Sequence, residues 1–417
     1  MKQYVYAVLS LWMTVAALKA ESAQAQTANV QVGPRPYYLV EQMAPSKLKQ
    51  RLAACAETRP APSDFSISHR GAPLQFPEHS LEGYRAAARM GAGILECDVT
   101  FTADGELVCR HAQCDLHATT DILQRPELRS KCHVAPQLAA DGTLTNPGEV
   151  NCCATDLTLT EFEGLCAKME GANPTASTTS EYVNATPSYR TDLYSSCATL
   201  MTHAESIALF SSLGAKFTPE LKSVARDREG QPLLSNGGFG ASGLDQATYA
   251  SKLVAEYQAA DIAPGNVFLQ SFDLNDVLYW VANFPEFAEQ AVYLIGRPNM
   301  AELPKLRGRG VRILGVPIAL LLSVDADGKL VASNYARLAR ASGLDLIAWT
   351  AERSGRMREE VKARGDFYYG PLLDAIEGDG AVMEIIHALA VEVGVLGIFS
   401  DWPGTVTYYA SCMQGDH

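Results

Sequence analysis

The chain has 417 residues, of which 47% are hydrophobic and 19% are charged, so it can bury a large core and lacks the low hydrophobicity of a disordered protein. With 34 basic and 47 acidic residues its formal net charge is −13, which argues against a general nucleic-acid binder, because such proteins need a basic face. Any phosphate site must therefore be a local basic spot.

The N-terminus has the pattern of an export signal. Lys2 supplies a positive charge, residues 4–18 form an apolar run, and Ala23-Gln24-Ala25 has the small-x-small pattern that a signal peptidase reads. The alternative is a membrane anchor, but the run is shorter than the roughly 20 apolar residues that span a bilayer. The sequence therefore predicts a signal peptide over residues 1–25 and an exported protein, periplasmic or secreted, with no transmembrane anchor after signal removal.

The segments that follow alternate between short apolar runs and helix-like stretches. After a Pro-containing lead-in over residues 26–64, eight runs read as strands: 65–69, 94–99, 216–222, 267–271, 291–295, 312–316, 344–349 and 395–401. Apolar residues at helical spacing predict helices that include 80–89, 246–260, 273–283 and 372–393.

This alternation predicts an α/β fold. A doubly wound open sheet is the competing arrangement, but no glycine-rich nucleotide fingerprint follows the first strand. Eight strands favour a (β/α)8 TIM barrel over residues 65–411.

One segment breaks the alternation, from Cys114 to about Leu200. It is rich in Thr, Pro, Gly and Cys and holds six of the ten cysteines of the chain. We interpret residues 114–200 as an insertion after the second strand and its hairpin, with little core of its own and held by disulfides, which persist in an exported protein.

Polar residues at the ends of the predicted strands are the candidates for chemistry, because barrel active sites lie at the C-terminal ends of strands. Glu96 and Asp98 are two residues apart, so both point to one face of their strand. Two inward carboxylates repel unless a cation lies between them, which predicts a hard divalent ion with Glu220 as a third ligand. A solvated edge strand is the simpler interpretation of the pair taken alone.

Two histidines are expected to flank this cation. His69 ends the first run, and Asp104-Gly105 predicts a hairpin turn that carries His111 back toward the carboxylates. Arg70 and Lys222 lie close by in sequence and are available to hold an anion. The combination predicts general acid–base catalysis on a phosphate ester.

Seven motifs follow one another from about residue 66 to residue 403: HRGA (69–72), PEHS (77–80), GAGILECDV (91–99), TADG (102–105), VCRH (108–111), ELK (220–222) and SDWP (400–403). As an ordered set they give the chain a resemblance to the glycerophosphodiester phosphodiesterase family. The departures are Glu-His-Ser at 78–80, where many members have Glu-Asn-Thr, and the long cysteine-rich insertion.

The resemblance implies an enzyme with one divalent cation, Ca²⁺ or Mg²⁺, that hydrolyses glycerophosphodiesters to glycerol 3-phosphate and an alcohol. It implies that His69 and His111 are the acid–base pair. It further implies that the metal ligands are Glu96, Asp98 and Glu220, and that Arg70 and Lys222 contact the phosphate. It also implies that the glycerol 2-hydroxyl attacks first, giving a cyclic phosphate that water then opens. Phe272 and Trp349 end two further runs and are expected to line the alcohol or glycerol side, with barrel packing as the alternative.

Two other functions remain open at this stage. One is a phospholipase D-like enzyme that acts on lysophospholipid or sphingolipid head groups, which would need an apolar channel or rim. The other is a non-catalytic surface-binding protein on the same barrel.

The cysteines give separate predictions. Barrel closure makes the first and last strands neighbours, so Cys55 and Cys412 are expected to form a bridge. Cys97 alternates with two inward ligands and is expected to face the helices as a small buried apolar residue, which need not be bridged. The remaining insertion cysteines are expected to pair mainly among themselves: Cys114, Cys132, Cys152, Cys153, Cys166 and Cys197.

Overall fold

The computed structural model describes residues 29–192, 194–226, 231–233 and 237–413. The signal peptide expected at residues 1–25 lies outside the described residues. No helix within those described ranges is both long enough and apolar enough to cross a membrane.

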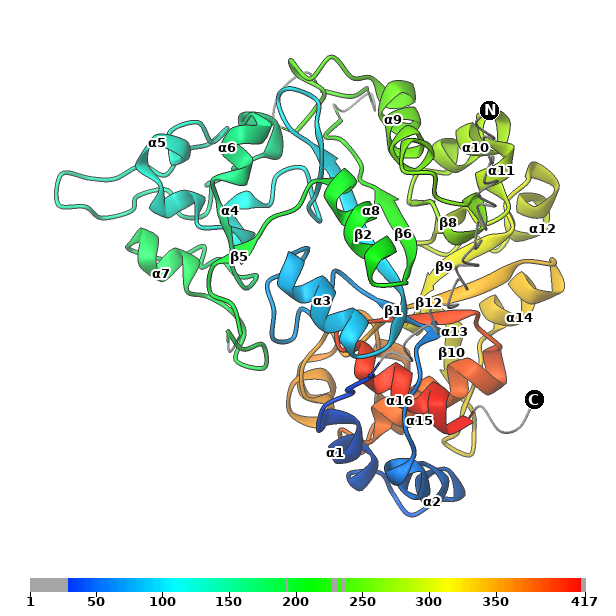
Figure 1. The fold of residues 1–417 in the computed structure, drawn as a ribbon. Helices are drawn as coiled ribbons and strands as arrows, with labels where there is room; N and C mark the ends of the chain where they lie inside the picture. Colours follow the sequence, from blue (N-terminus) through cyan, green and yellow to red (C-terminus); the bar gives the residue numbers. More distant parts are fainter. Residues whose placement is uncertain (1–28, 193, 227–230, 234–236, 414–417) are drawn as a thin grey trace, which may run out of the picture.

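The centre of the protein is a closed barrel of eight parallel strands (Figure 1). β1 pairs in parallel with both β2 and β13, which closes the sheet. The barrel strands, in the order in which they pair, are β1 (Ser63–Ser68), β13 (Gly397–Ser400), β12 (Asp345–Ala351), β9 (Ile313–Pro317), β8 (Val292–Leu294), β7 (Gln270–Ser271), β6 (Lys216–Leu221) and β2 (Ala92–Phe101). Each overlaps one of the eight predicted runs, so the predicted TIM barrel is confirmed.

Helices surround the barrel and shield the outward face of its strands. They are α3 (Leu81–Arg89), α8 (His203–Ser212), α9 (Gln246–Ala259), α10 (Leu274–Asn283), α11 (Pro285–Ala288), α12 (Leu303–Leu306), α13 (Ile318–Leu321), α14 (Asn334–Ala341), α15 (Ala381–Ala388) and α16 (Pro403–Met413). A large apolar cluster fills the layer between strands and helices, whereas a smaller one, with Ile67, Ile94 and Phe399 among its members, fills the interior of the barrel. The barrel is therefore a packed core and not a pore.

The predicted lead-in forms two helices, α1 (Arg35–Glu41) and α2 (Lys47–Ala54), which contact α16. A disulfide joins Cys55, just after α2, to Cys412 near the end of α16, so the predicted bridge between the chain ends is confirmed. A bridge that spans 357 residues of sequence requires the first and last strands to be neighbours, as barrel closure makes them.

The cysteine-rich segment, residues 114–200, projects from one side of the barrel (Figure 1). Its elements are short: α4 (Leu116–Thr119), α5 (Pro126–Arg129), α6 (Leu159–Glu163), β4 (Cys166–Ala167), α7 (Thr179–Val183) and β5 (Ala198–Thr199). Its six cysteines pair among themselves, as expected: Cys114–Cys153, Cys132–Cys152 and Cys166–Cys197. The segment also has its own cluster of buried apolar side chains, which includes Leu116, Phe162 and Tyr182. It is thus less dependent on its disulfides than the composition suggests, while its limits stay a prediction.

Cys97 forms a disulfide, although its buried position did not require one. Cys97 is buried on the outward face of β2, as expected, but it is bonded to Cys109 on β3 (Leu107–Cys109). β3 folds back antiparallel on β2 with Val99 opposite Cys109, so Cys97 and Cys109 are diagonal neighbours on one face. The register of the hairpin, which was not part of the prediction, brings the two sulfurs together.

The helix expected over residues 372–393 is also interrupted. A 3₁₀ segment, Gly370–Ala375, precedes a turn, α15 follows, and π-helical turns end the stretch at Leu389–Val393. At the turn, a Cβ on Gly380 would lie 2.5 Å from the backbone nitrogen of Met43. The close approach of the N-terminal lead-in therefore leaves no room for a side chain at this position, which the apolar periodicity does not indicate.

Candidate active site

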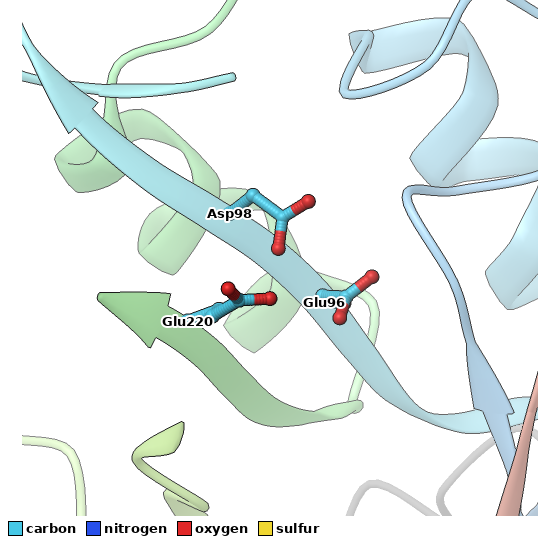
Figure 2. A group of neighbouring side chains, drawn as sticks. All are labelled: Glu96, Asp98 and Glu220. Carbon is cyan, nitrogen blue, oxygen red and sulfur yellow. The ribbon is translucent and has the colours of Figure 1, made fainter. Parts of the chain in front are cut away.

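Three carboxylates meet near the C-terminal ends of two neighbouring strands. Glu96 and Asp98 lie on β2 and Glu220 lies on β6, where it is the register partner of Asp98. One oxygen of each carboxylate lies within 4.8 Å of the others, and all three residues are buried (Figure 2). Alternation along β2 puts Glu96 and Asp98 on the same face, and parallel pairing adds Glu220. Such a set of oxygen ligands suits a hard divalent cation.

The electrostatics of this group show why a cation would stabilise it. Burial raises the pKa of Glu96 well above its ordinary value, and the charges of Asp98 and Glu220 raise it further. Burial also raises the pKa of Glu220 to about 7. Burial opposes ionisation of Asp98 too, but Lys222 and His79 hold the pKa of Asp98 well below its ordinary range. Ionising all three carboxylates together requires compensating positive charge.

His69 lies directly after β1 and is held by a carboxylate from the other end of the chain. Its Nδ1 lies 2.5 Å from Oδ1 of Asp401, which follows β13. This contact leaves Nε2 as the ring nitrogen available for proton transfer. Burial lowers the pKa of His69 to about 4 in spite of the opposing charge of Asp401, so the ring is neutral near pH 7.

Arg70 connects the first strand to the carboxylates. Its backbone nitrogen donates to Glu96 at 2.9 Å, and its guanidinium pairs with Glu78 at 3.0 Å and with Asp98 at 3.6 Å. Its φ of 53° lies in the left-handed region, which is strained for a residue with a side chain. Backbone strain of this kind is maintained only where surrounding contacts hold it.

His111 reaches the cavity on the predicted hairpin. β2 and β3 pair antiparallel, and Gly105 in the turn has a φ of 79°, which glycine adopts readily. The next residue after β3, Arg110, donates its backbone N–H to the carbonyl of Asp98 at 2.7 Å, which fixes the path into His111. Burial, together with the charges of Arg70 and Lys222, lowers the pKa of His111 well below its ordinary value.

The remaining basic residue, Lys222, follows β6 and pairs with Glu220 at 2.7 Å. Burial disfavours its charged form, but Asp98 and Glu220 raise the pKa of Lys222 above its ordinary value, so it stays protonated. A fixed ammonium group thus lies beside the carboxylates.

All nine predicted site residues line one cavity of about 260 Å³ at the C-terminal end of the barrel: His69, Arg70, Glu96, Asp98, His111, Glu220, Lys222, Phe272 and Trp349. The rings of Phe272 and Trp349 meet edge to face with their centroids 5.8 Å apart, and Phe367 stacks on the other side of Trp349 at 5.9 Å. The cavity is small for a ligand site and combines a charged floor with an aromatic wall.

Several residues at the site were not predicted. Gln270, on β7, is the register partner of Glu220 and donates to Glu96 at 2.9 Å. It ends a predicted strand, so the rule that singled out Glu220 could also have found it. His79 contacts Asp98 at 2.9 Å, and Arg353 lines the cavity. Both approach from loops, where no periodicity indicates the direction of a side chain.

An eight-stranded parallel barrel with carboxylates, histidines and basic groups around one cavity at its C-terminal end defines a barrel enzyme that acts on an anionic substrate. The model of the glycerophosphoryl diester phosphodiesterase family matches residues 69–405. The chain belongs to this family and is therefore an enzyme of the phosphoric diester hydrolase class.

Individual proteins are similar to the chain over different parts of its length. A protein of Arthroderma benhamiae named "Extracellular protein" is 41% identical over 255 residues, which cover 59% of this chain and 100% of that protein. The "Probable glycerophosphodiester phosphodiesterase 1" of Mycobacterium tuberculosis is 51% identical over 47 residues, covering 11% of this chain and 17% of that protein. A solved structure from Silicibacter pomeroyi, provisionally assigned as a glycerophosphoryl diester phosphodiesterase, shares the fold with a TM-score of 0.52 at 18% identity, covering 83% of this chain and 93% of that one.

Proposed function

We propose that this protein hydrolyses glycerophosphodiesters to glycerol 3-phosphate and an alcohol, with one divalent cation and a pair of histidines. The observation that carries the proposal is the convergence of the carboxylate group, His69 and His111 on one cavity of about 260 Å³. Membership of the family supports the same activity.

The residues fit a cation of the Ca²⁺ or Mg²⁺ type. Glu96, Asp98 and Glu220 would hold it, since they offer only hard oxygen donors. Oδ1 of Asp98 and Oε1 of Gln270 are buried and have no hydrogen-bond partner among the residues that the structure describes, so two further acceptor atoms are available there. When bound, the cation would neutralise charge that develops on the phosphate oxygens.

The side chains of the chain itself perform the remaining steps of the proposed reaction. Arg70 and Lys222 hold the phosphate through their donor groups. One histidine removes the proton of the glycerol 2-hydroxyl while the other protonates the leaving alcohol, which gives the cyclic phosphate. When water opens the cyclic phosphate the two histidines exchange roles, so both return to their starting protonation states. Asp401 fixes the ring of His69 through Nδ1, as the carboxylate of a catalytic triad does for its histidine.

The aromatic wall supports a second candidate substrate class. Phe272 is 40% exposed and Phe367 is 59% exposed, and both contact Trp349 at the edge of the cavity. Exposed aromatic side chains beside a phosphate site suit an amphiphilic phosphodiester, such as a lysophospholipid. A phospholipase D-like activity at this site is therefore the second candidate.

The compartment we propose is extracellular or periplasmic. Five disulfides account for all ten cysteines, which is typical of oxidising compartments. The Arthroderma benhamiae relative is named as an extracellular protein.

The test is a comparison of two substrates by the products they release. Glycerophosphocholine should give glycerol 3-phosphate and choline, and the His111→Ala variant should release both at least about 100-fold more slowly. Faster release of choline from lysophosphatidylcholine would favour the second candidate. Binding of glycerol 3-phosphate without turnover of either substrate would contradict both and indicate a non-catalytic binding protein.

A further inference from the structure

A network of charged side chains joins the cysteine-rich segment to the barrel beside His69. Arg190, from the segment, pairs with Glu170 at 2.8 Å and with Oδ2 of Asp401 at 2.9 Å. Arg353, which follows β12, pairs with the same two carboxylates at 3.0 and 3.2 Å. Two guanidinium groups and two carboxylates therefore alternate in a closed ring, with one side from the segment and the other from the barrel.

Asp401 uses both carboxylate oxygens in this arrangement. Oδ2 accepts from the two arginines, while Oδ1 contacts Nδ1 of His69 at 2.5 Å. Because two guanidinium groups hold Oδ2, the carboxylate cannot rotate about the Cβ–Cγ bond without breaking charge-assisted hydrogen bonds. The orientation of Oδ1, and with it that of the His69 ring, depends on the arginines.

Arg190 is the more deeply buried of the two arginines, since its side chain is 3% exposed against 14% for Arg353. A buried guanidinium without carboxylate partners is costly, so the ring of charges holds together as a unit. Arg353 also lines the active-site cavity, whereas Arg190 does not. Arg190 is therefore placed to act on His69 only through Asp401.

The segment holds both of its contributing residues firmly. Lys168 donates to the carbonyls of Ala118, Met169 and Gly171 at 2.7–2.9 Å, which fixes the loop that carries Glu170. Directly after Arg190, the backbone nitrogen of Thr191 donates to the carbonyl of Leu74 at 3.0 Å, which ties this part of the segment to the loop after β1. The positions of both charges are thus set by backbone contacts on each side of the junction.

We propose that Glu170 and Arg190 are positioning residues of the active site, which orient His69 for proton transfer through Asp401. The proposal rests on the proposed acid–base role of His69. It gives the cysteine-rich segment a part in turnover, although neither Glu170 nor Arg190 touches the reacting atoms. The competing possibility is that the ion pairs only attach the segment to the barrel.

Kinetics of single and double variants separate these two possibilities. With glycerophosphocholine as substrate, Arg190→Gln should lower kcat about tenfold to 100-fold and change KM by less than about threefold, because it misplaces a proton-transfer group and leaves the phosphate contacts intact. Asp401→Asn should lower kcat as well, and adding Arg190→Gln to it should cost no more than about another twofold, since both act through one contact. Full additivity of the two losses would overturn the proposal.

The matched control is Arg125→Gln in the same segment. Arg125 forms an ion pair with Asp121 at 2.7 Å, and its side chain is 39% exposed. This variant should keep the wild-type kcat, since the guanidinium that it removes belongs to the same segment but pairs with Asp121 and not with Asp401. If Arg190→Gln does not fold, Glu170→Gln decides in its place, because it removes the carboxylate that holds both arginines beside Asp401 and leaves Arg190 itself in the chain; an unchanged kcat in that variant would overturn the proposal.

A spectroscopic measurement keeps the inference separate from the proposed activity. In protein labelled with ¹⁵N-histidine, the ring nitrogens of His69, assigned by comparison with His69→Ala, should report a single tautomer. In Arg190→Gln the same signals should shift toward a mixture of tautomers. An unchanged His69 spectrum would overturn the positioning role even if the wild type is active, whereas an inactive wild type with the expected shift would contradict the proposed function alone.

Discussion

The barrel and the cysteine-rich segment are stabilised in different ways. The barrel buries apolar strands beneath helices and has a separate cluster of apolar side chains inside. The Cys55–Cys412 disulfide joins the segments of the chain that come before and after the barrel. The segment consists of helices and strands of at most five residues, a smaller apolar cluster and three internal disulfides. The comparison teaches that regular packing places the three buried carboxylates and the histidines around one cavity, while a cross-linked irregular segment adds charged side chains at the rim.

The largest expected effect tests the contribution of the barrel. Replacing His69 or His111 with alanine should lower kcat by roughly 10²–10⁴, the usual contribution of a positioned proton-transfer group. His387→Ala is the matched control, because His387 contacts Tyr409 on α16 and lies outside the cavity. Near-normal kcat in either active-site variant would remove that histidine from the mechanism.

A second variant sharpens the role of the charged floor. Arg70→Lys keeps the charge but loses the planar fork of donors, so kcat/KM should fall about tenfold to 100-fold. Steady-state kinetics on glycerophosphocholine measure it. An unchanged kcat/KM would show that Arg70 serves only the fold, through its contacts to Glu78 and Glu96.

Removing a disulfide tests whether the segment can be destabilised without destabilising the barrel. The Cys132–Cys152 bridge closes a loop of 20 residues in the segment, and replacing both cysteines with serine should destabilise the segment by about 3 kcal/mol on the chain-entropy model. Because the bridge lies outside the cavity, kcat should stay within about threefold of the wild type. Hydrogen exchange measured residue by residue should show faster exchange of backbone amides in the segment. An equal loss of protection in the barrel strands would contradict the idea that the segment and the barrel are stabilised separately.

Asp401 gives a pH dependence at the junction of the two regions. Burial alone would raise its pKa, but Arg353, His69 and Arg190 lower the pKa of Asp401 to about 2, from an ordinary 3.8. The unfolded chain therefore takes up this proton first, so the stabilising contribution is complete above the ordinary pKa and is lost as the pH falls through about 2. This contribution of Asp401 to the free energy of unfolding is about 2 kcal/mol. The free energy of unfolding of the wild type should fall by about that much more than that of Asp401→Asn between about pH 6 and pH 2, and parallel pH curves would contradict it.

The sequence was sufficient for the features that depend on local pattern and closure. Apolar runs located all eight barrel strands, alternation placed Glu96 and Asp98 on one face, and the Asp-Gly turn brought His111 to the cavity. Barrel closure gave the Cys55–Cys412 bridge. Each of these follows from periodicity or topology, which a single sequence contains.

The features that escaped prediction depend on contacts between distant segments. The hairpin register that pairs Cys97 with Cys109 has no local signal, and the break before α15 lies where Met43 packs closely against Gly380. The pair of Arg190 with Asp401 joins residues 211 positions apart from a loop without periodicity. Such contacts are fixed by how loops pack, which the spacing of residue types does not contain.

The most direct test of the account is glycerol 3-phosphate release from glycerophosphocholine by protein freed of divalent ions, before and after adding Ca²⁺ or Mg²⁺. The account predicts no turnover in excess chelator and recovery when either ion is returned, with Glu220→Gln failing to recover fully because it lacks one charged ligand. Full activity of the wild type in excess chelator would contradict the account.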